Sequence, residues 1–171
     1  MLIIFVVVLF LFAIYILYVF LPLLEGGPYV PTRIENVEFI IKTLKEDYGI
    51  ERFIRGVDVG SGDGRIVISL AKAGIDCDGI EKSKLLCNIS QKKAIEAKVQ
   101  DKCKFINSNF FNVNLAQYDL VVAFQAPYVM NKLGKKIKRE MKPGSIVASY
   151  CYKIGFLNEV KYINYWHIYE V

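Results

Sequence analysis

The sequence predicts an α/β domain with a parallel sheet, preceded by a separate apolar helix. Through residues 56–150, short apolar segments typical of strands alternate with helical segments, which is the pattern of a parallel sheet with helices on both faces. The first 24 residues contain no charged side chain, whereas all 22 Lys and Arg and all 17 Asp and Glu of the 171-residue chain follow them. The chain therefore combines one domain of ordinary size with one segment of different composition.

Residues 1–24 are predicted to form a transmembrane anchor. A helix needs about 20 apolar residues to cross a bilayer, and this run supplies them. A cleaved signal peptide would begin with basic residues and end in small residues, and a buried core helix would have to hide an apolar surface on every side. Because Arg33, Lys42 and Lys45 follow the run, we expect a single-pass membrane protein with its domain on the cytoplasmic side, or on the matrix side of the mitochondrial inner membrane in a eukaryote.

Residues 25–32 are predicted to be a linker, with the domain proper at 33–171. The linker contains residues that disfavour a helix, namely Gly26, Gly27, Pro28 and Pro31. Thr32 and Glu35 have the spacing of a capping box, so Thr32 is expected to cap the next helix. Apolar residues at helical spacing then predict a helix over about 33–47.

The rest of the domain alternates between strands and helices. The apolar patterns predict strands at 56–59, 77–81, 104–107, 118–124 and 145–150, and helices at 65–74, 83–98 and 129–141. Only 21 residues follow the strand at 145–150. We expect 162–171 to form the final strand and 157–160 to supply part of its partner, which leaves little or no room for a further helix.

The glycine-rich stretch DVGSGDG at 58–64 lies between a predicted strand and a predicted helix. A dinucleotide site would need its third glycine at position 65, which is Arg65. Asp63 brings a carboxylate into the loop, where it would repel a diphosphate and favour a cation. S-adenosylmethionine carries an ammonium and a sulfonium and no phosphate. Glu81 closes the second strand, where a carboxylate can accept hydrogen bonds from both ribose hydroxyls.

These segments resemble a known family. VDVGSGDGRIVISLAKAG followed by GIEKS is similar to the first two cofactor motifs of the seven-strand S-adenosylmethionine-dependent methyltransferases. More narrowly, GGPYVPT, SNFFNVNL at 108–115 and residues 121–152 resemble the membrane-anchored protein lysine methyltransferases that act on the ATP synthase c subunit and the adenine nucleotide translocase. The resemblance covers about residues 26–152. It implies a Rossmann-like seven-strand sheet, here with a short C-terminal end, and S-adenosylmethionine as cofactor.

The resemblance also implies site residues. The predicted cofactor-binding residues are Asp58, Gly60, Ser61, Gly62, Asp63, Gly64, Glu81 and Asn109. Asn109 stands where the superfamily often has an Asp that contacts the adenine amine. On the acceptor side, Gln125 and Tyr128 are the predicted catalytic residues, because an amide carbonyl can accept a hydrogen from an amine while an aromatic ring holds the acceptor. Ala126 departs from the two prolines that amino-methyltransferases carry there.

The implied reaction is methyl transfer to a lysine of a membrane protein near the bilayer surface. The sulfonium already activates the methyl group, so the protein must mainly place the nucleophile in line and exclude water. Making a lysine neutral at pH 7 costs roughly 4 to 5 kcal/mol, part of which burial in an aromatic channel supplies. Candidates for the channel wall are Phe110, Phe111, Phe124, Tyr128, Tyr150 and Tyr152.

Other functions stay open at this point. The acceptor could be a lipid, a small amine or nucleic acid, although a net charge of +5 is too modest to favour nucleic acid. A membrane-tethered module that binds the cofactor or a partner without catalysis is the other alternative. The four cysteines show no C-x-x-C spacing, so no metal site is expected, and His167 is predicted to be a strand residue.

Overall fold

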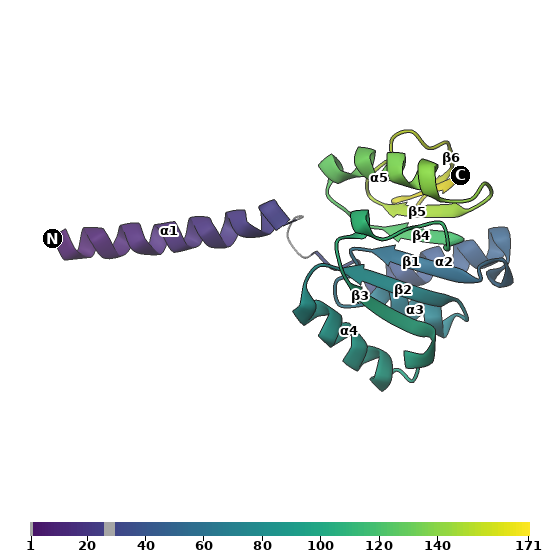
Figure 1. Ribbon diagram of the computed structural model, residues 1–171, viewed down its shortest axis with the longest axis horizontal. Helices are drawn as coiled ribbons and strands as arrows, with labels where there is room; N and C mark the ends of the chain where they lie inside the picture. Colours follow the sequence, from purple (N-terminus) through teal and green to yellow (C-terminus); the bar gives the residue numbers. More distant parts are fainter. Residues whose placement is uncertain (1, 26–29) are drawn as a thin grey trace. The chain divides into compact units, whose positions relative to one another are not determined.

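The computed structural model describes residues 2–25 and 30–171, without the side chains of residues 2, 3, 5 and 17–25. The chain forms two compact units, Met1–Val30 and Pro31–Val171. Helix α1, Leu2–Glu25, belongs to the first unit (Figure 1). Within the described part of the chain, none of the helices combines the length and apolar character that crossing a membrane requires. Met1 of the predicted anchor and residues 26–29 of the predicted linker lie outside the described residues, and the predicted boundaries stay predictions.

The second unit contains one seven-stranded mixed sheet. Its strand order is β3-β2-β1-β4-β5-β7-β6 (Figure 1). The first five strands run parallel, and β7 runs antiparallel to both β5 and β6. The strands are β1 Arg55–Val59, β2 Asp76–Glu81, β3 Cys103–Asn107, β4 Leu120–Ala123, β5 Ile146–Tyr150, β6 Glu159–Ile163 and β7 Trp166–Glu170. The prediction of a Rossmann-like α/β sheet with seven strands is confirmed.

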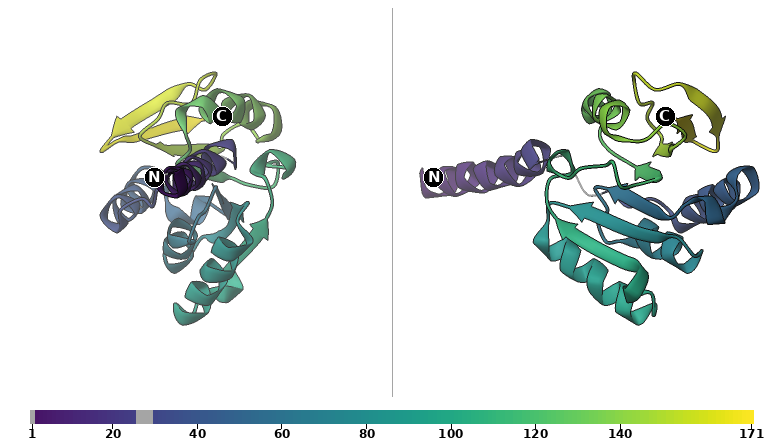
Figure 2. Two further views of the ribbon diagram at one scale, coloured as in Figure 1. Left: turned by 90° about the vertical axis from the view of Figure 1, so that its left-hand side faces the viewer. Right: turned by 45° about the vertical axis from the view of Figure 1, so that its right-hand side comes forward.

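Helices cover both faces of the sheet. On one face lie α2 Ile34–Tyr48, α3 Arg65–Lys72 and α4 Lys84–Glu96, whose buried residues form one core with the strands. On the other face, α5 Pro127–Glu140 packs with the short helix η3 Phe110–Asn112 over a second core. The left view of Figure 2 shows α2 and α5 on opposite sides of the sheet. Two further short helices, η1 Ile50–Arg52 and η2 Gln100–Lys102, precede β1 and β3.

The start of α2 differs from the sequence prediction. The N-cap residue is Arg33, which is extended and makes no side-chain cap, so the predicted capping box is wrong. Thr32 lies one residue too early to cap. It is buried, and its carbonyl accepts a hydrogen bond of 2.9 Å from Nη1 of Arg65, the first residue of α3. The start of the domain is therefore fixed by a tertiary contact with the glycine-rich loop rather than by a local cap.

The C-terminal end is a hairpin. Residues 151–158 form no helix, as predicted, and lead to β6. The turn between β6 and β7 contains Asn164 and Tyr165, both with positive φ, which suits the right-handed twist of a two-residue hairpin loop. The predicted final strand at 162–171 therefore begins too early, because Tyr162 and Ile163 belong to β6. The prediction for His167 is confirmed, since it lies buried in β7.

Candidate active site

The glycine-rich loop after β1 is the centre of the site. Gly60, Gly62 and Gly64 all have positive φ, between +53° and +80°, a region that residues with a Cβ rarely adopt. The loop is tied to the next strand because the N–H groups of Gly60 and Ser61 donate to the carbonyl of Ile80 at 2.8 and 3.1 Å. A Cβ at Gly64 would lie 2.8 Å from Ser90 and 2.9 Å from the Phe105 ring, so a side chain there has no space. The loop thus brings bare backbone to the carboxyl edge of the sheet.

Ser61 turns into the protein rather than out of it. The residue is buried, and a Cβ at Gly79 of β2 would lie 2.6 Å from its Oγ. The hydroxyl therefore packs against the backbone of β2. A side chain at position 79 would collide with this hydroxyl, which explains the glycine there.

Glu81 ends β2 and is held from both sides. Its Oε2 accepts a hydrogen bond from Gly62 N at 3.0 Å, and its Oε1 accepts one from Ser83 N at 2.8 Å. Ser83 in turn caps α4 by accepting from Leu86 N. Each carboxylate oxygen keeps acceptor capacity, so a fixed Glu81 can still accept from two hydroxyls.

Asp58, near the end of β1, is a buried acid with two other acids, Glu81 and Asp63, close enough to affect its ionisation. It is 2% exposed. Burial raises its pKa to about 8, with further contributions from the negative charges of Glu81 and Asp63. A carboxyl in these surroundings ionises readily only beside a positive charge. The ammonium of S-adenosylmethionine carries such a charge, so the acids at the ends of β1 and β2 fit this cofactor and would not fit a diphosphate.

Asp63 has protein partners of its own. Its carboxylate accepts from Nε and Nη2 of Arg65, each at 2.9 Å, and from Nζ of Lys93 in α4. Burial alone would raise its pKa, but these hydrogen bonds and charges hold the pKa well below its usual range. The ion pair fastens the loop to α4. Sequence reasoning missed Lys93, because nothing in the sequence links residues thirty positions apart.

Asn109 follows β3 on the same edge. Its Oδ1 accepts from Phe111 N at 3.0 Å and so caps η3, while the neighbouring Ser108 N donates to the carbonyl of Glu81 at 3.0 Å. The residue is therefore fixed beside the end of β2. Its contact with adenine stays a prediction.

Gln125 lies directly against the glycine-rich loop. Its Nε2 donates to the carbonyl of Val59 at 2.8 Å, and a Cβ at Gly60 would come within 1.9 Å of the same nitrogen. Because the amide donates through nitrogen, its Oε1 is the atom that can accept from an amine. Tyr128, the second residue of α5, is 64% exposed. The structure places both residues at the carboxyl end of β4 and brings Gln125 into contact with the loop.

A cluster of aromatic side chains adjoins Gln125. The ring of Phe124 lies 5.1 Å from Tyr150, edge to face, and 6.4 Å from Tyr152, stacked. The Tyr150 hydroxyl accepts from Asn36 Nδ2 at 2.7 Å, a partner that sequence reasoning missed. We call Phe124, Tyr150 and Tyr152 the aromatic cluster. Of the other channel candidates, Phe110 is buried in the core beneath α5, and Phe111 packs against it.

The fold and this arrangement are those of an S-adenosylmethionine-dependent methyltransferase. A crystal structure of an RNA methyltransferase from Salinibacter ruber in complex with S-adenosyl-L-homocysteine matches with a TM-score of 0.73 and 28% identity, covering 82% of this chain and 92% of that one. Residues 58–161, more than half of the chain, match the family described as the ANTKMT methyltransferase domain. The chain belongs to this methyltransferase family. The predictions of enzyme class and cofactor are thereby confirmed.

Curated relatives carry lysine methyltransferase names. The rat protein named as the lysine N-methyltransferase of the ATP synthase c subunit is 39% identical over 122 residues, which cover 71% of this chain and 54% of the relative. A Saccharolobus islandicus protein named Protein-lysine N-methyltransferase is 28% identical over 134 residues, covering 74% and 78%. The mouse adenine nucleotide translocase lysine N-methyltransferase is 30% identical over 129 residues, covering 75% and 54%. The chain spans about half the length of most of these relatives.

Proposed function

We propose that this chain is a membrane-anchored methyltransferase that methylates lysine side chains of a membrane-associated protein. The observation that carries the proposal is the aromatic cluster around Phe124, the chain neighbour of Gln125, whose amide contacts the loop that fits S-adenosylmethionine. The names of the curated relatives support lysine as the acceptor. The proposed substrate is a membrane protein that presents a lysine near the bilayer surface.

The cofactor site uses residues that the structure already holds in place. When bound, S-adenosylmethionine supplies a methyl group activated by its sulfonium. Asp58 would accept hydrogen bonds from the ammonium, and Glu81 would accept from the ribose hydroxyls. Gly60 and Gly62 let the backbone approach closely because they carry no Cβ. In this proposal Asp58 and Glu81 bind opposite parts of the cofactor, and the glycines give it room.

The acceptor site must bind a lysine amine that is charged in solution at pH 7 and favour its neutral form. A lysine is neutral in only a small fraction of molecules at pH 7, and a half-buried aromatic wall favours that neutral form by excluding water. Phe124 and Tyr152 would flank the lysine side chain, and Oε1 of Gln125 would accept a hydrogen from the amine. Catalysis then consists of placing the amine nitrogen in line with the methyl group.

The membrane anchor is proposed from composition. Residues 1–24 lack charged side chains and outnumber the roughly 20 apolar residues with which a helix crosses a bilayer core of about 30 Å. Arg33, Lys42 and Lys45 follow this segment, which supports the cytoplasmic or matrix side for the domain. Recovery of the full chain in the membrane fraction after an alkaline carbonate wash would support the anchor, and its release would contradict it.

The test of activity uses the full chain purified in detergent. It is incubated with radiolabelled S-adenosylmethionine and membranes from a strain that lacks it, and the labelled product is identified by mass spectrometry. Asp58→Asn should abolish labelling, whereas Asp101→Asn, a matched change at an exposed acid in η2, should not. Label on a lysine of a membrane protein supports the proposal. Label in the lipid fraction would support a methyltransferase but contradict lysine as its acceptor.

RNA is the second acceptor to test. The observation in its favour is the match to a solved structure titled an RNA methyltransferase. The same incubation with total RNA from that strain distinguishes the two acceptors. Label that is sensitive to ribonuclease and absent from protein would favour RNA.

A further inference from the structure

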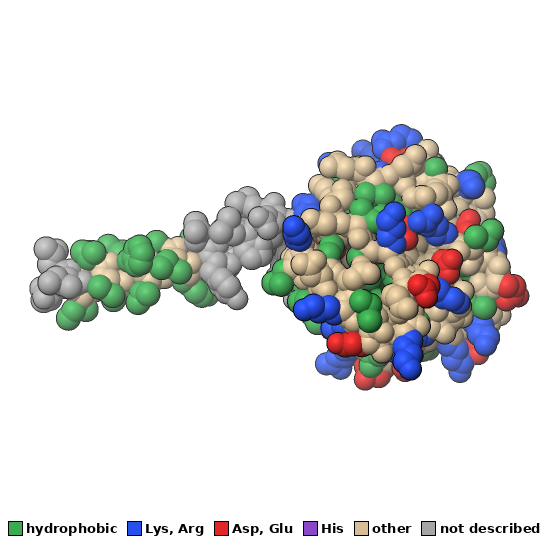
Figure 3. Space-filling model, turned by 60° about the horizontal axis from the view of Figure 1, so that its bottom comes forward, with side chains coloured by type: hydrophobic (Ala, Val, Ile, Leu, Met, Phe, Trp, Pro, Cys, Tyr) green, Lys and Arg blue, Asp and Glu red, His purple; other side chains and the backbone are tan. Residues whose placement is uncertain are grey.

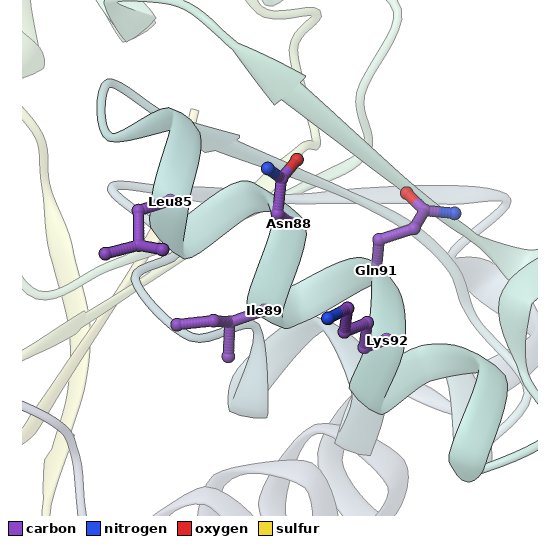
Figure 4. Close-up of a pocket in the computed structure, with 5 residues that line it drawn as sticks. All are labelled: Leu85, Asn88, Ile89, Gln91 and Lys92. Carbon is purple, nitrogen blue, oxygen red and sulfur yellow. The ribbon is translucent and has the colours of Figure 1, made fainter.

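One lysine of the domain is buried. Figure 3 shows Lys and Arg side chains spread over one face of the domain surface. Lys92 is an example of such a residue, since it is exposed and lines a pocket whose other side chains also come from α4 (Figure 4). Lys136 of α5 is 5% exposed and is the only buried lysine among the residues that the structure describes. A buried ammonium needs hydrogen-bond partners, so its contacts indicate what this residue does.

The ammonium of Lys136 donates to a carboxylate and to a backbone carbonyl. Nζ lies 2.6 Å from Oε2 of Glu140, one turn later in α5, and 3.3 Å from the carbonyl oxygen of Phe111. The same Oε2 accepts from Leu115 N at 3.2 Å. Burial alone would raise the pKa of Glu140, but hydrogen bonds from Lys136 and Arg139 hold this pKa below its usual value. The ion pair therefore fastens the segment between β3 and β4 to α5 at two points.

Phe111 connects this ion pair to a predicted residue of the cofactor site. The Phe111 N–H donates to Oδ1 of Asn109 at 3.0 Å, while the Phe111 carbonyl accepts from Lys136. Lys132 adds a contact from α5, because its Nζ lies 4.4 Å from the centroid of the Phe111 ring. On the other side, Ser108 N donates to the carbonyl at the end of β2 at 3.0 Å. Asn109 therefore lies between one residue tied to β2 and one tied to α5.

Packing alone does not require an ion pair at this position. Leu133 and Ile137 of the same helix are buried in an apolar core that includes Phe110. Replacing a buried ion pair by apolar residues of similar volume is often neutral or stabilising. An apolar side chain at position 136 could fill the same space, but it could not donate to the Phe111 carbonyl. What Lys136 adds is therefore the position of η3.

We infer that Lys136 and Glu140 are positioning residues that hold η3 so that Asn109 contacts the adenine of the cofactor. Asn109 Oδ1 accepts from Phe111 N and keeps a second lone pair, which can accept from the adenine amine. An oxygen in place of that amine would face Oδ1 with no hydrogen between them. The inference rests on the predicted contact of Asn109 with adenine, and it is independent of which acceptor is methylated.

The experiment compares two ligands that differ at the adenine amine. Isothermal titration measures how the full chain in detergent binds S-adenosyl-L-homocysteine and S-inosyl-L-homocysteine, in which a carbonyl oxygen replaces the amine. The test variant is Lys136→Met with Glu140→Gln, which leaves no buried charge unpaired and keeps an acceptor oxygen at position 140. The matched control is Lys42→Met with Glu46→Gln, an exposed pair at the same spacing in α2. Fluorescence of the buried Trp166 shows whether each variant is folded.

We expect the wild-type chain to bind the adenosyl ligand about 10- to 100-fold more tightly than the inosyl ligand, the value of a hydrogen bond whose loss leaves an acceptor unpaired. The test variant should lose most of this ratio through weaker binding of the adenosyl ligand, and the control should keep it. Asn109→Ala should lose the same ratio, with no further loss when it is combined with the test variant, because both act on one contact.

Two results would overturn the inference. One is a wild-type chain that binds both ligands equally well. The other is a test variant that keeps the full ratio, whether or not both affinities fall, because a merely structural role of the ion pair would not depend on the adenine amine. Methyl transfer to lysine tests the proposed function separately, since neither ligand carries a methyl group to transfer.

Discussion

Replacing Asp58 by Asn should stabilise the cofactor-free protein, although it removes a residue of the site. The folded chain binds the Asp58 proton with a pKa of about 8, against 3.8 for the ordinary carboxyl. Since the folded chain binds this proton more tightly than the unfolded chain, stability falls as the pH rises from about 4 to about 8. The full shift corresponds to an upper limit of about 6 kcal/mol, and between pH 5 and pH 8 the loss reaches about 3 to 4 kcal/mol. An asparagine cannot ionise and suffers none of this loss.

The assay is urea unfolding of the full chain in mild detergent at pH 5 and pH 8. Trp166 is the one tryptophan of the chain and is buried between the sheet and α2, so its fluorescence reports unfolding of the domain. The free energy gained by Asp58→Asn should be larger at pH 8 than at pH 5 by several kcal/mol. The pH-independent cost of fitting the amide cancels in this comparison. If the gain is equal at both pH values, Asp58 does not titrate in this range and the argument for a cation-binding acid fails.

Three further substitutions test the loop and its supports. Gly60→Ala should weaken S-adenosylmethionine binding and should destabilise the domain, each effect being larger than that of Gly74→Ala. Both glycines have positive φ, but only at Gly60 would a Cβ meet another side chain. Isothermal titration measures the binding and urea unfolding the stability, and equal effects of the two substitutions would contradict this interpretation. Glu81→Gln should raise the dissociation constant about 10- to 100-fold, the value of one charge-assisted hydrogen bond, and unchanged binding would remove this residue from the site. Lys93→Met should lower stability by about 3 kcal/mol or less at neutral pH, because the Asp63 carboxylate loses one of its cations. The loss should shrink only below the usual carboxyl range near pH 4, because the folded chain holds the pKa of Asp63 well below that range, and a loss that does not shrink there would show packing as its cause.

The parts of the site that the sequence could predict are those encoded in consecutive residues. The glycines of the loop indicate a left-handed backbone by their chemistry alone, and Glu81 is placed by the end of the strand that carries it. Gln125 came from resemblance to a family, and its contact with Gly60 gives that assignment a physical basis.

The parts that the sequence could not predict depend on contacts between distant segments. The contact of Asp63 with a cation of the cofactor stays a prediction, whereas its ion pair with Lys93 of α4 could not be read from the sequence. The spacing of Thr32 and Glu35 suggested a local cap, yet the tertiary hydrogen bond from Arg65 holds Thr32 instead. At Thr32 a local pattern competes with a long-range contact, and the structure contains the long-range contact.

The buried acid Asp58 also determines how activity should depend on pH. In the cofactor-free protein Asp58 is mostly protonated at pH 7, so binding a cationic cofactor releases a proton and affinity rises as the pH approaches 8. The neutral fraction of a lysine acceptor rises in the same direction, but up to a pKa near 10.4. With limiting S-adenosylmethionine the rate should therefore rise about 100-fold per pH unit below pH 8 and about tenfold above it. With saturating cofactor only the lysine titration remains, and the rate should rise about tenfold per unit throughout. Initial rates at the two cofactor concentrations separate the two titrations, and identical profiles would mean that Asp58 does not exchange its proton for the cofactor.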